Sequence, residues 1–452
     1  MEALTSQNFD RLAKAMMQRH RVAYDCARKM LAELTLRLTC GEEIRESAAL
    51  QAAFLTAINT GKRAFRGGVT VSLPSRVRLR VPWPGGASLN EVARSIGAHD
   101  SKQGDDGNTS WLMFGTIPDA TEGIQVFCDG WRAGLAPVGQ ATSFQKGYDF
   151  ALGGVFAGAF AVAKIFLSAA EISHRDIVEP SGFSLWRPDL SWLDADSAGP
   201  ALQHLPAKLW LLGLGHLGQA YAWTLGLLPF TWENPATIYL QDYDVVEKAN
   251  WSAGLFCEQN HVGQLKTRLS AEWLEQRGFQ TRLIERPFDV NTKRESNEPR
   301  VALCGFDNAE SRQIIENANF ELIVDAGLGA SLDHFDRLVL RTFPDGSQKA
   351  RDIWGRPGDE ISAIDLSLFE KPDGQCGIVL QEIAGKAISS SFTGACASSL
   401  VVGEVLRAIQ GGRRCDFVAL QLRDLELPQN PYRDENYQLR VARNGIVPVD
   451  LG

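Results

Sequence analysis

The feature that most constrains this chain is a glycine-rich turn, Gly213-Leu-Gly215-His-Leu-Gly218, which directly follows the apolar residues 209–212. Three glycines at this spacing between a strand and a helix let backbone N–H groups and the helix N-terminus face a phosphate. Asp242 follows 24 positions beyond the last glycine, where a carboxylate can accept both ribose hydroxyls. The alternative, glycines that serve helix packing alone, is the weaker interpretation once the second strand and its acid are included.

Polar residues further along the chain favour a site that splits ATP. Asp244 points to the same side as Asp242 if the strand continues, and a solvated loop acid is its alternative. Lys266 offers a compact positive charge for a phosphate. Asp307 follows the strand-like residues 301–306, where a carboxylate can hold Mg²⁺ or cap the next helix. A redox Rossmann domain needs neither this lysine nor the second strand-end acid.

Composition limits the classes of function. The chain has 452 residues, enough for two or three domains, with 44% hydrophobic and 22% charged residues and a net charge of −8. No basic run stands out, which argues against nucleic-acid binding. The eight cysteines form no CxxC pair, so neither a structural zinc site nor a dense disulfide framework is indicated.

The chain is expected to be cytoplasmic and to have no membrane segment. Its first residues lack the basic and then apolar pattern of a signal peptide. The longest apolar stretch, residues 150–167, is interrupted by Lys164 and is short for a membrane span. Reduced thiols are expected in that compartment.

Apolar spacing predicts three regions in an α/β chain. Residues 1–62 are expected to form an N-terminal helical segment, 63–180 a smaller domain, and 207–452 the nucleotide-binding domain, with a linker rich in Pro, Ser and Asp over 180–206. A faint internal repeat links the two domains. In each, a strand runs into an acid and a glycine, which are Asp129-Gly130 in the first domain and Asp325-Ala-Gly327 in the second, and a small-residue helix follows later. The first domain is then a degenerate relative of the second; two unrelated alanine-rich core helices are the alternative.

Residues 208 to about 411 resemble the adenylating domain of ubiquitin-activating enzymes and of their bacterial relatives ThiF and MoeB. The family pattern is the glycine turn, Asp-x-Asp with an Asn eight residues after the first Asp, Gly-x-x-Lys, and Asp-Asn-x-x-x-Arg. This chain has each part at the expected interval: Asp242-Tyr-Asp244, Asn250, Gly263-Gln-Leu-Lys266 and Asp307-Asn-Ala-Glu-Ser-Arg312.

The resemblance implies a Rossmann-like ThiF/MoeB adenylation domain, preceded by a degenerate adenylation-like domain and N-terminal helices. It implies Mg-ATP-dependent adenylation of the C-terminal glycine of a ubiquitin-like protein. Gly213, Gly215, Gly218, Asp242, Asp244 and Lys266 would bind the nucleotide, Asp307 the Mg²⁺, and Lys266, Asn250 and Arg312 would be catalytic. The acyl group would pass to an enzyme thiol and then to a ubiquitin-conjugating-like enzyme. A bacterial ubiquitin-like conjugation system with a role in antiviral defence is one setting.

Cys376 is the predicted nucleophile. It lies in Pro372-Asp-Gly-Gln-Cys376-Gly, a glycine-flanked segment ahead of the last small-residue helix, where the family places its thioester cysteine in the crossover loop. An accessible thiol there would be reactive. The alternative is a cysteine that acts as a small hydrophobic residue, which is the expectation for Cys396, Cys304 and Cys128.

Two departures from the family pattern matter. The family has an arginine that contacts the ATP phosphates three residues after the Asn, and this chain has Ala253 there. Arg19 or Arg21 of the N-terminal helices, or Arg312, are candidate replacements. The zinc-binding CxxC pairs of many MoeB-like members are also missing.

These departures leave alternatives open. The first alternative is ThiF-like activation of a sulfur carrier without a thioester. The second, favoured by Ala253, is a pseudoenzyme that binds a ubiquitin-like protein without turnover. The third is an NAD(P) oxidoreductase. MoeB-like relatives form homodimers, but a fused degenerate domain could supply that surface internally. Residues 415–452 receive no role.

Overall fold

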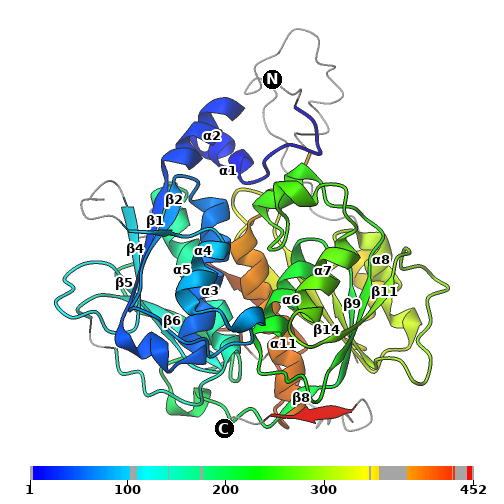
Figure 1. The fold of residues 1–452 in the computed structure, drawn as a ribbon. Helices are drawn as coiled ribbons and strands as arrows, with labels where there is room; N and C mark the ends of the chain where they lie inside the picture. Colours follow the sequence, from blue (N-terminus) through cyan, green and yellow to red (C-terminus); the bar gives the residue numbers. More distant parts are fainter. Residues whose placement is uncertain are drawn as a thin grey trace.

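The computed structural model describes residues 4–101, 109–140, 142–173, 177–345, 348–355, 383, 385–429, 431–432 and 445–449. It contains two seven-stranded sheets with a central group of helices between them (Figure 1). The strand orders are β3-β2-β1-β4-β5-β6-β7 and β11-β10-β9-β12-β13-β14-β15. In each sheet the first five strands run parallel to one another, and the last two strand pairings are antiparallel. The predicted α/β fold class is confirmed, and the two halves share one topology.

The first half begins with two short helices and then builds its sheet. Its elements are α1 (Ala13–His20), α2 (Tyr24–Glu33), β1 (Thr35–Cys40), α3 (Ala48–Ala64), β2 (Gly68–Ser72), α4 (Leu89–Ser95), β3 (His99–Asp100), β4 (Thr109–Phe114), β5 (Ile124–Cys128), β6 (Arg132–Pro137), α5 (Ala151–Ala169) and β7 (Ser181–Ser184).

The second half repeats this order after the short strand β8 (His204–Pro206), which pairs with β16 (Ile446–Pro448). Its elements are β9 (Lys208–Leu212), α6 (His216–Leu227), β10 (Thr237–Gln241), α7 (Lys266–Glu275), β11 (Gln280–Ile284), β12 (Val301–Cys304), α8 (Ala309–Gln313), β13 (Leu322–Leu328), β14 (Arg337–Phe343), α9 (Ala350–Trp354), α11 (Ser391–Ile409) and β15 (Phe417–Gln421).

Burial explains why the central strands are so apolar. All four residues of β12 are buried, as are the last four of β9, because parallel strands are covered by helices on both faces. The carboxyl ends of β9, β10 and β12 meet at one edge, where open α/β sheets bind their ligands.

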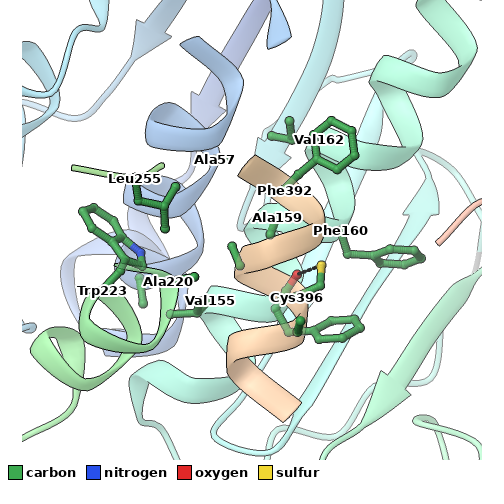
Figure 2. Packing of buried hydrophobic residues seen from close by; sticks show 14 of the residues in the cluster. Ala57, Val155, Ala159, Phe160, Val162, Ala220, Trp223, Leu255, Phe392 and Cys396 are labelled. Atoms are coloured by element: carbon green, nitrogen blue, oxygen red, sulfur yellow. Dashed lines mark hydrogen bonds between the residues drawn. The ribbon is translucent and has the colours of Figure 1, made fainter. Parts of the chain in front are cut away.

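The core between the sheets is made by α3, α5, α6 and α11, which pack against one another (Figure 2). Small residues such as Ala57, Ala159 and Ala220 let these helices approach closely. Cys396 of α11 is fully buried, with Sγ 3.8 Å from the Phe156 carbonyl oxygen of α5. Cys128 and Cys304 are also buried, which confirms the interpretation of all three as core residues.

Two of these helices, α5 and α11, are long and apolar enough to cross a membrane by length and composition alone. In each, 89% of the apolar window is buried inside the protein. Their apolar character therefore reflects their central position between the two sheets (Figure 1).

The first half differs from the prediction at its start. The expected helical segment over 1–62 is interrupted by β1, whose residues alternate between partly exposed and buried, and which pairs with both β2 and β4. A boundary at residue 62 falls inside α3. The helix-like apolar spacing over 31–38 concealed this short strand. Residues 77–81 alternate apolar and charged side chains as a strand does, but they form only an isolated bridge between Arg78 and Ser88. The expected linker contains β7 and β8.

Candidate active site

The glycine turn connects β9 to α6 with an open helix N-terminus. Gly213 has φ of +81°, a conformation that favours glycine. A Cβ on Gly218 would lie 2.0 Å from the Gly213 carbonyl oxygen, so only glycine lets the helix start so close to the strand end. Gly215 is the N-cap residue, and no side chain caps the helix. The first N–H groups of α6 are therefore available to an anion.

Asp242 supports the glycine turn from the end of β10. Its carboxylate accepts hydrogen bonds from Leu214 N at 2.5 Å and from Asp244 N at 2.8 Å. The second acid of the pair contacts the predicted lysine, since Asp244 Oδ2 lies 2.8 Å from Lys266 Nζ. The two strand-end acids thus lie together, with one bonded to the turn and one to the cation.

Lys266 is buried at the start of α7. Burial acts to lower its pKa, but the hydrogen bond to Asp244 and the charges of Asp242, Asp244 and Asp307 outweigh burial and raise it. The side chain is therefore a firmly protonated cation beside three carboxylates. Such a charge suits a polyphosphate, which would bring further negative oxygens.

Asn250 lies in a short 3₁₀ helix over Lys248–Ser252 that forms the opposite wall. Its Oδ1 accepts the Glu247 N–H at 2.9 Å, and the Glu247 side chain caps the Asn250 backbone in return. Ala253 ends this helix and is 5% exposed. Reciprocal hydrogen bonds thus hold this wall, and the chain has alanine where the family has its arginine.

Asp307 and Arg312 flank the end of β12. Asp307 is exposed, and Asn308, not Asp307, caps α8 by accepting Ser311 N–H at 2.7 Å. Arg312 Nη2 donates to the Ala326 carbonyl at 2.6 Å, and its Nε lies 3.2 Å from Asp325 Oδ1. Burial acts to lower the pKa of Arg312, but the adjacent Asp325 carboxylate raises it, so the guanidinium remains charged beneath the site.

One cavity of about 860 Å³ is lined by nearly all of the predicted residues. Those residues are Gly213, Gly215, Asp242, Asp244, Asn250, Lys266, Asp307 and Arg312. Gly218 does not line it and acts through packing. Phe288 and Phe306, with ring centroids 5.4 Å apart, add an aromatic side. Small and apolar residues form another side of the cavity: Leu328, Gly329, Ala330, Ala387 and Ile388.

Arg11 is the residue that sequence reasoning missed. It precedes α1 in the first half, yet it lines the cavity of the second half, and its Nε is buried with no hydrogen-bond partner among the described residues. The hydrogen bond from Ala249 N to Gln7 O, 2.7 Å long, holds this segment against the Asn250 wall. No motif marks Arg11, because only tertiary packing brings it there.

The earlier candidates from the N-terminal helices lie elsewhere. Arg19 Nε donates to the Glu171 carbonyl of the first half at 2.5 Å. Arg21 is exposed at the left-handed C-terminal residue of α1. Neither of these two candidates for the missing arginine lines the cavity, whereas the third candidate, Arg312, does, as does Arg11.

The predicted nucleophile Cys376 lies outside the described residues. The seven described cysteines are free, and six of them are buried. Burial raises the pKa of each buried thiol, which are Cys40, Cys128, Cys257, Cys304, Cys396 and Cys415. The exposed Cys26 lies on α2 and does not line the cavity. The six buried thiols therefore have structural rather than reactive surroundings.

The described residues contain no group of three or more His, Cys, Asp and Glu side chains that could hold a metal ion. Mg²⁺ does not require one, because it keeps several waters and takes one or two carboxylates together with substrate phosphates. The exposed Asp307 at the cavity fits such a partial site.

Comparison with known proteins identifies the class. Residues 35–185 match the BilD N-terminal domain and residues 205–412 the BilD C-terminal domain. The chain is 35% identical over 435 residues to the bacterial E1-like protein BilD of Collimonas sp. (strain OK412), covering 92% of both chains. These matches place the chain in the class of E1-like proteins. Because the likeness runs through both halves, the chain belongs to the BilD family.

Solved structures give more distant matches. Escherichia coli MccB is 17% identical to this chain, with a TM-score of 0.36. The match covers 50% of this chain and 62% of MccB, so it spans less than two thirds of the length of MccB. PaaA is 14% identical with a TM-score of 0.34, over 50% of this chain and 64% of PaaA.

Proposed function

We propose that this protein uses Mg-ATP to adenylate the C-terminal glycine of a ubiquitin-like protein and then carries the acyl group as a thioester on Cys376. The observation that carries the proposal is the open N-terminus of α6 in one cavity with Asp242, Lys266 and Asp307. Membership in an E1-like family supports adenylation as the chemistry.

The first step is an attack by the substrate carboxylate on the α-phosphorus. A carboxylate oxygen forms the new P–O bond, the bond to the bridging oxygen breaks, and pyrophosphate leaves. Lys266 and Arg11 would neutralise the phosphates, with the α6 N-terminus on the glycine turn and the ribose at Asp242. Asp307 would hold Mg²⁺, which supplies charge neutralisation of the phosphate oxygens. Fixed positive groups of this kind lower the barrier by positioning and electrostatics.

The second step transfers the acyl group. The Cys376 thiol loses its proton to solvent, its thiolate attacks the carbonyl carbon of the acyl-adenylate, and AMP leaves with the former α-phosphate. A ubiquitin-conjugating-like enzyme would then accept the acyl group by transthiolation. The proposed setting is the reducing cytoplasm, in line with seven described free thiols. Antiviral conjugation is one use of such a pathway.

The packing of the two halves against each other has a consequence for the oligomeric state. Helices α3 and α5 of the first half pack on α6 and α11 of the second, which is the face a second adenylation domain could cover. We therefore propose that the first half takes the place of a partner subunit and that a homodimer is not needed. Light scattering coupled to size-exclusion chromatography tests this.

A second candidate function is a binding protein without turnover, which Ala253 favours. Arg11 weighs against it, because it returns a cation to the cavity from another part of the chain. Activation of a sulfur carrier would use the same adenylation step but would form no thioester on Cys376.

Removal of the Asp307 carboxylate tests adenylation. Asp307→Ala should lower ATP–pyrophosphate exchange, measured with the ubiquitin-like substrate, at least 100-fold, because Mg²⁺ loses its protein ligand. Glu122→Ala, at an exposed loop acid of the first half, is the control and should exchange normally. Exchange that survives in Asp307→Ala would contradict the metal assignment.

Removal of the Cys376 thiol separates the two steps. Cys376→Ala should keep exchange while the protein–substrate adduct that is cleaved by thiols disappears from non-reducing gels. Cys26→Ala, at an exposed cysteine away from the cavity, is the control and should keep the adduct. An adduct that persists in Cys376→Ala would assign the thioester to another cysteine.

A further inference from the structure

A buried arginine of the first half contacts the loop over residues 250–257, which contributes one wall of the cavity. Arg63 lies in the last turn of α3, and its side chain is fully buried. Its Nη1 donates to the Trp251 carbonyl at 2.6 Å and to the Cys257 carbonyl at 3.1 Å. Its Nη2 donates to the Leu255 carbonyl at 2.9 Å. One planar guanidinium thus binds three carbonyl oxygens of this loop, in a fixed geometry that an ammonium group cannot reproduce.

The charge of this arginine is compensated next to the loop. Glu258 Oε1 accepts hydrogen bonds from Arg63 Nη2 at 3.2 Å and from Lys62 Nζ at 2.6 Å. Asn59, one turn earlier in α3, donates to the Leu255 carbonyl at 3.2 Å. Lys62 therefore shares the carboxylate with Arg63, but the hydrogen bonds from α3 to the loop carbonyls come from Asn59 and Arg63. The ion pair and the carbonyl contacts can thus be separated by experiment.

The same loop carries residues that line the cavity. Asn250 and Gly254 line it, as does Gln219 of α6. The Asn250 carbonyl accepts the Gly254 N–H at 2.7 Å, and Gln219 Oε1 accepts the Phe256 N–H at 3.0 Å. Gln219 Nε2 also donates to the Leu214 carbonyl of the glycine turn at 3.2 Å. A displacement of the loop would therefore move both the cavity wall and its connection to the glycine turn.

We propose that Arg63 is a positioning residue for adenylation: it holds residues 250–257 so that Asn250 keeps its place at the cavity. This inference rests on the proposed function, together with the catalytic role that the family resemblance implies for Asn250. Arg63 does not line the cavity, so it acts through the backbone of the loop. Charge-assisted hydrogen bonds are stronger than neutral ones, and a displacement of about 1 Å can cost about 100-fold in rate. The first half thus takes part in the reaction by holding one wall of the site.

A double-mutant cycle distinguishes positioning from a purely structural role. Arg63→Met should lower the kcat of ATP–pyrophosphate exchange about 10-fold or more in protein that circular dichroism shows to be folded, because Asn250 is displaced. Its affinity for Mg-ATP, measured by calorimetry, should change little, since the charged groups of the nucleotide site are intact. In the Asn250→Ala background the same substitution should cost about 2-fold or less. An equal loss of kcat in both backgrounds, or a lower affinity for Mg-ATP with unchanged kcat, would overturn the proposal.

Two further variants separate the carbonyl contacts from the charge. Lys62→Met removes the other cation on Glu258 but no donor to a loop carbonyl, so its kcat should remain close to that of wild type. Arg63→Lys keeps the charge with a different donor geometry, and its kcat should fall between those of wild type and Arg63→Met. If Arg63→Met does not fold, Arg63→Lys takes its place in the cycle. An equal loss of kcat in Lys62→Met and Arg63→Lys would assign the effect to the charge on Glu258 and contradict positioning.

Amide hydrogen exchange tests the loop without any turnover. The N–H groups of Gly254 and Phe256 should exchange about 10-fold faster in Arg63→Met than in wild type, because local opening becomes easier. Mass spectrometry of peptides from this loop measures the rates, and Lys62→Met should behave like wild type. Unchanged rates in Arg63→Met would overturn the proposal. A wild type without ATP–pyrophosphate exchange would instead refute the proposed function, and the amide rates would still decide whether Arg63 holds the loop.

Discussion

The ends of β1 and β4 in the first half and of β9 and β12 in the second are equivalent places with different contents. In the first half the Glu43 carboxylate lies between the strand ends, with both oxygens 3.2 Å from Thr116 N. Burial acts to raise the pKa of Glu43, but these hydrogen bonds outweigh burial and lower it. In the second half Gly213 and Gly305 face each other there, and both line the cavity.

Asp149 does the same at the start of α3, where its carboxylate accepts hydrogen bonds from Ser47 Oγ, Ala48 N and Ala49 N. In the first half, two carboxylates of the chain itself thus fill the strand ends and the helix start. The same topology therefore gives one half in which these places are filled and one half in which the equivalent places line a cavity. The choice depends on a few side chains at the strand ends rather than on the fold.

The largest expected effect on stability concerns Gly218 of α6. The first half has Leu50 at the equivalent position of α3, two residues after the first residue of the helix. Gly218→Ala should destabilise the protein by about 3 kcal/mol, because its Cβ would overlap the Gly213 carbonyl oxygen, which is backbone and cannot move away. Gly215→Ala, whose Cβ would meet nothing within 4 Å, should be nearly as stable as wild type. Urea unfolding of both variants decides the matter, and equal stability would contradict the close approach.

The second half could be predicted well because its constraints are local. The glycine turn, the strand over 237–241 and the acids that follow it are read from neighbouring residues, and the structure brings them to one cavity. The roles of those residues in catalysis stay predictions. Arg11 could not be found in this way, since it lies more than 200 positions from the turn and no periodicity connects the two.

The internal repeat was visible in the sequence but misaligned. The faint match paired the Asp129-Gly130 corner with Asp325. Strand register instead places Asp325 beside Cys304 and Val126 beside Phe114, so the counterpart of the second-half acid is Val126. Acids and glycines alone do not fix a register, because a shift of three residues preserves a similar pattern of residue types. Only the pairing of neighbouring strands resolves it.

A smaller loss of stability is expected when the Asp149 carboxylate is removed from the start of α3. Asp149→Ala should destabilise the protein by about 2 kcal/mol, because three donors at the start of α3 lose a charged acceptor. Asp149→Asn should cost about half as much, because one amide oxygen can still accept. Asp194→Asn, at the exposed cap of a short 3₁₀ helix, is the control and should change stability by a few tenths of a kcal/mol. Urea unfolding measures all three, and an Asp149→Ala variant as stable as the control would show that the carboxylate does not stabilise the start of α3.

The smallest effect is a pH dependence of stability, which is expected from the first residue of α6 and not from that of α3. His216 begins α6, whereas Ala48 begins α3. Burial, helped by the positive charges of Arg11 and Arg63, lowers the pKa of His216 to about 4, against the opposing hydrogen bond to Ser390. In the unfolded chain the same group titrates near 6.5. Between these values the unfolded state binds the proton and the folded state does not, so stability falls as the pH falls below 6.5.

At pH 5.5 this histidine should cost the folded protein about 1 kcal/mol relative to pH 7.5. His216→Gln, which cannot be protonated, should remove that part of the pH dependence, and His99→Gln, at an exposed histidine of the first half, should leave it in place. Urea unfolding at the two pH values measures the difference. If wild type and His216→Gln lose stability equally, the start of α6 does not exclude a proton, and the acid sensitivity arises elsewhere in the chain.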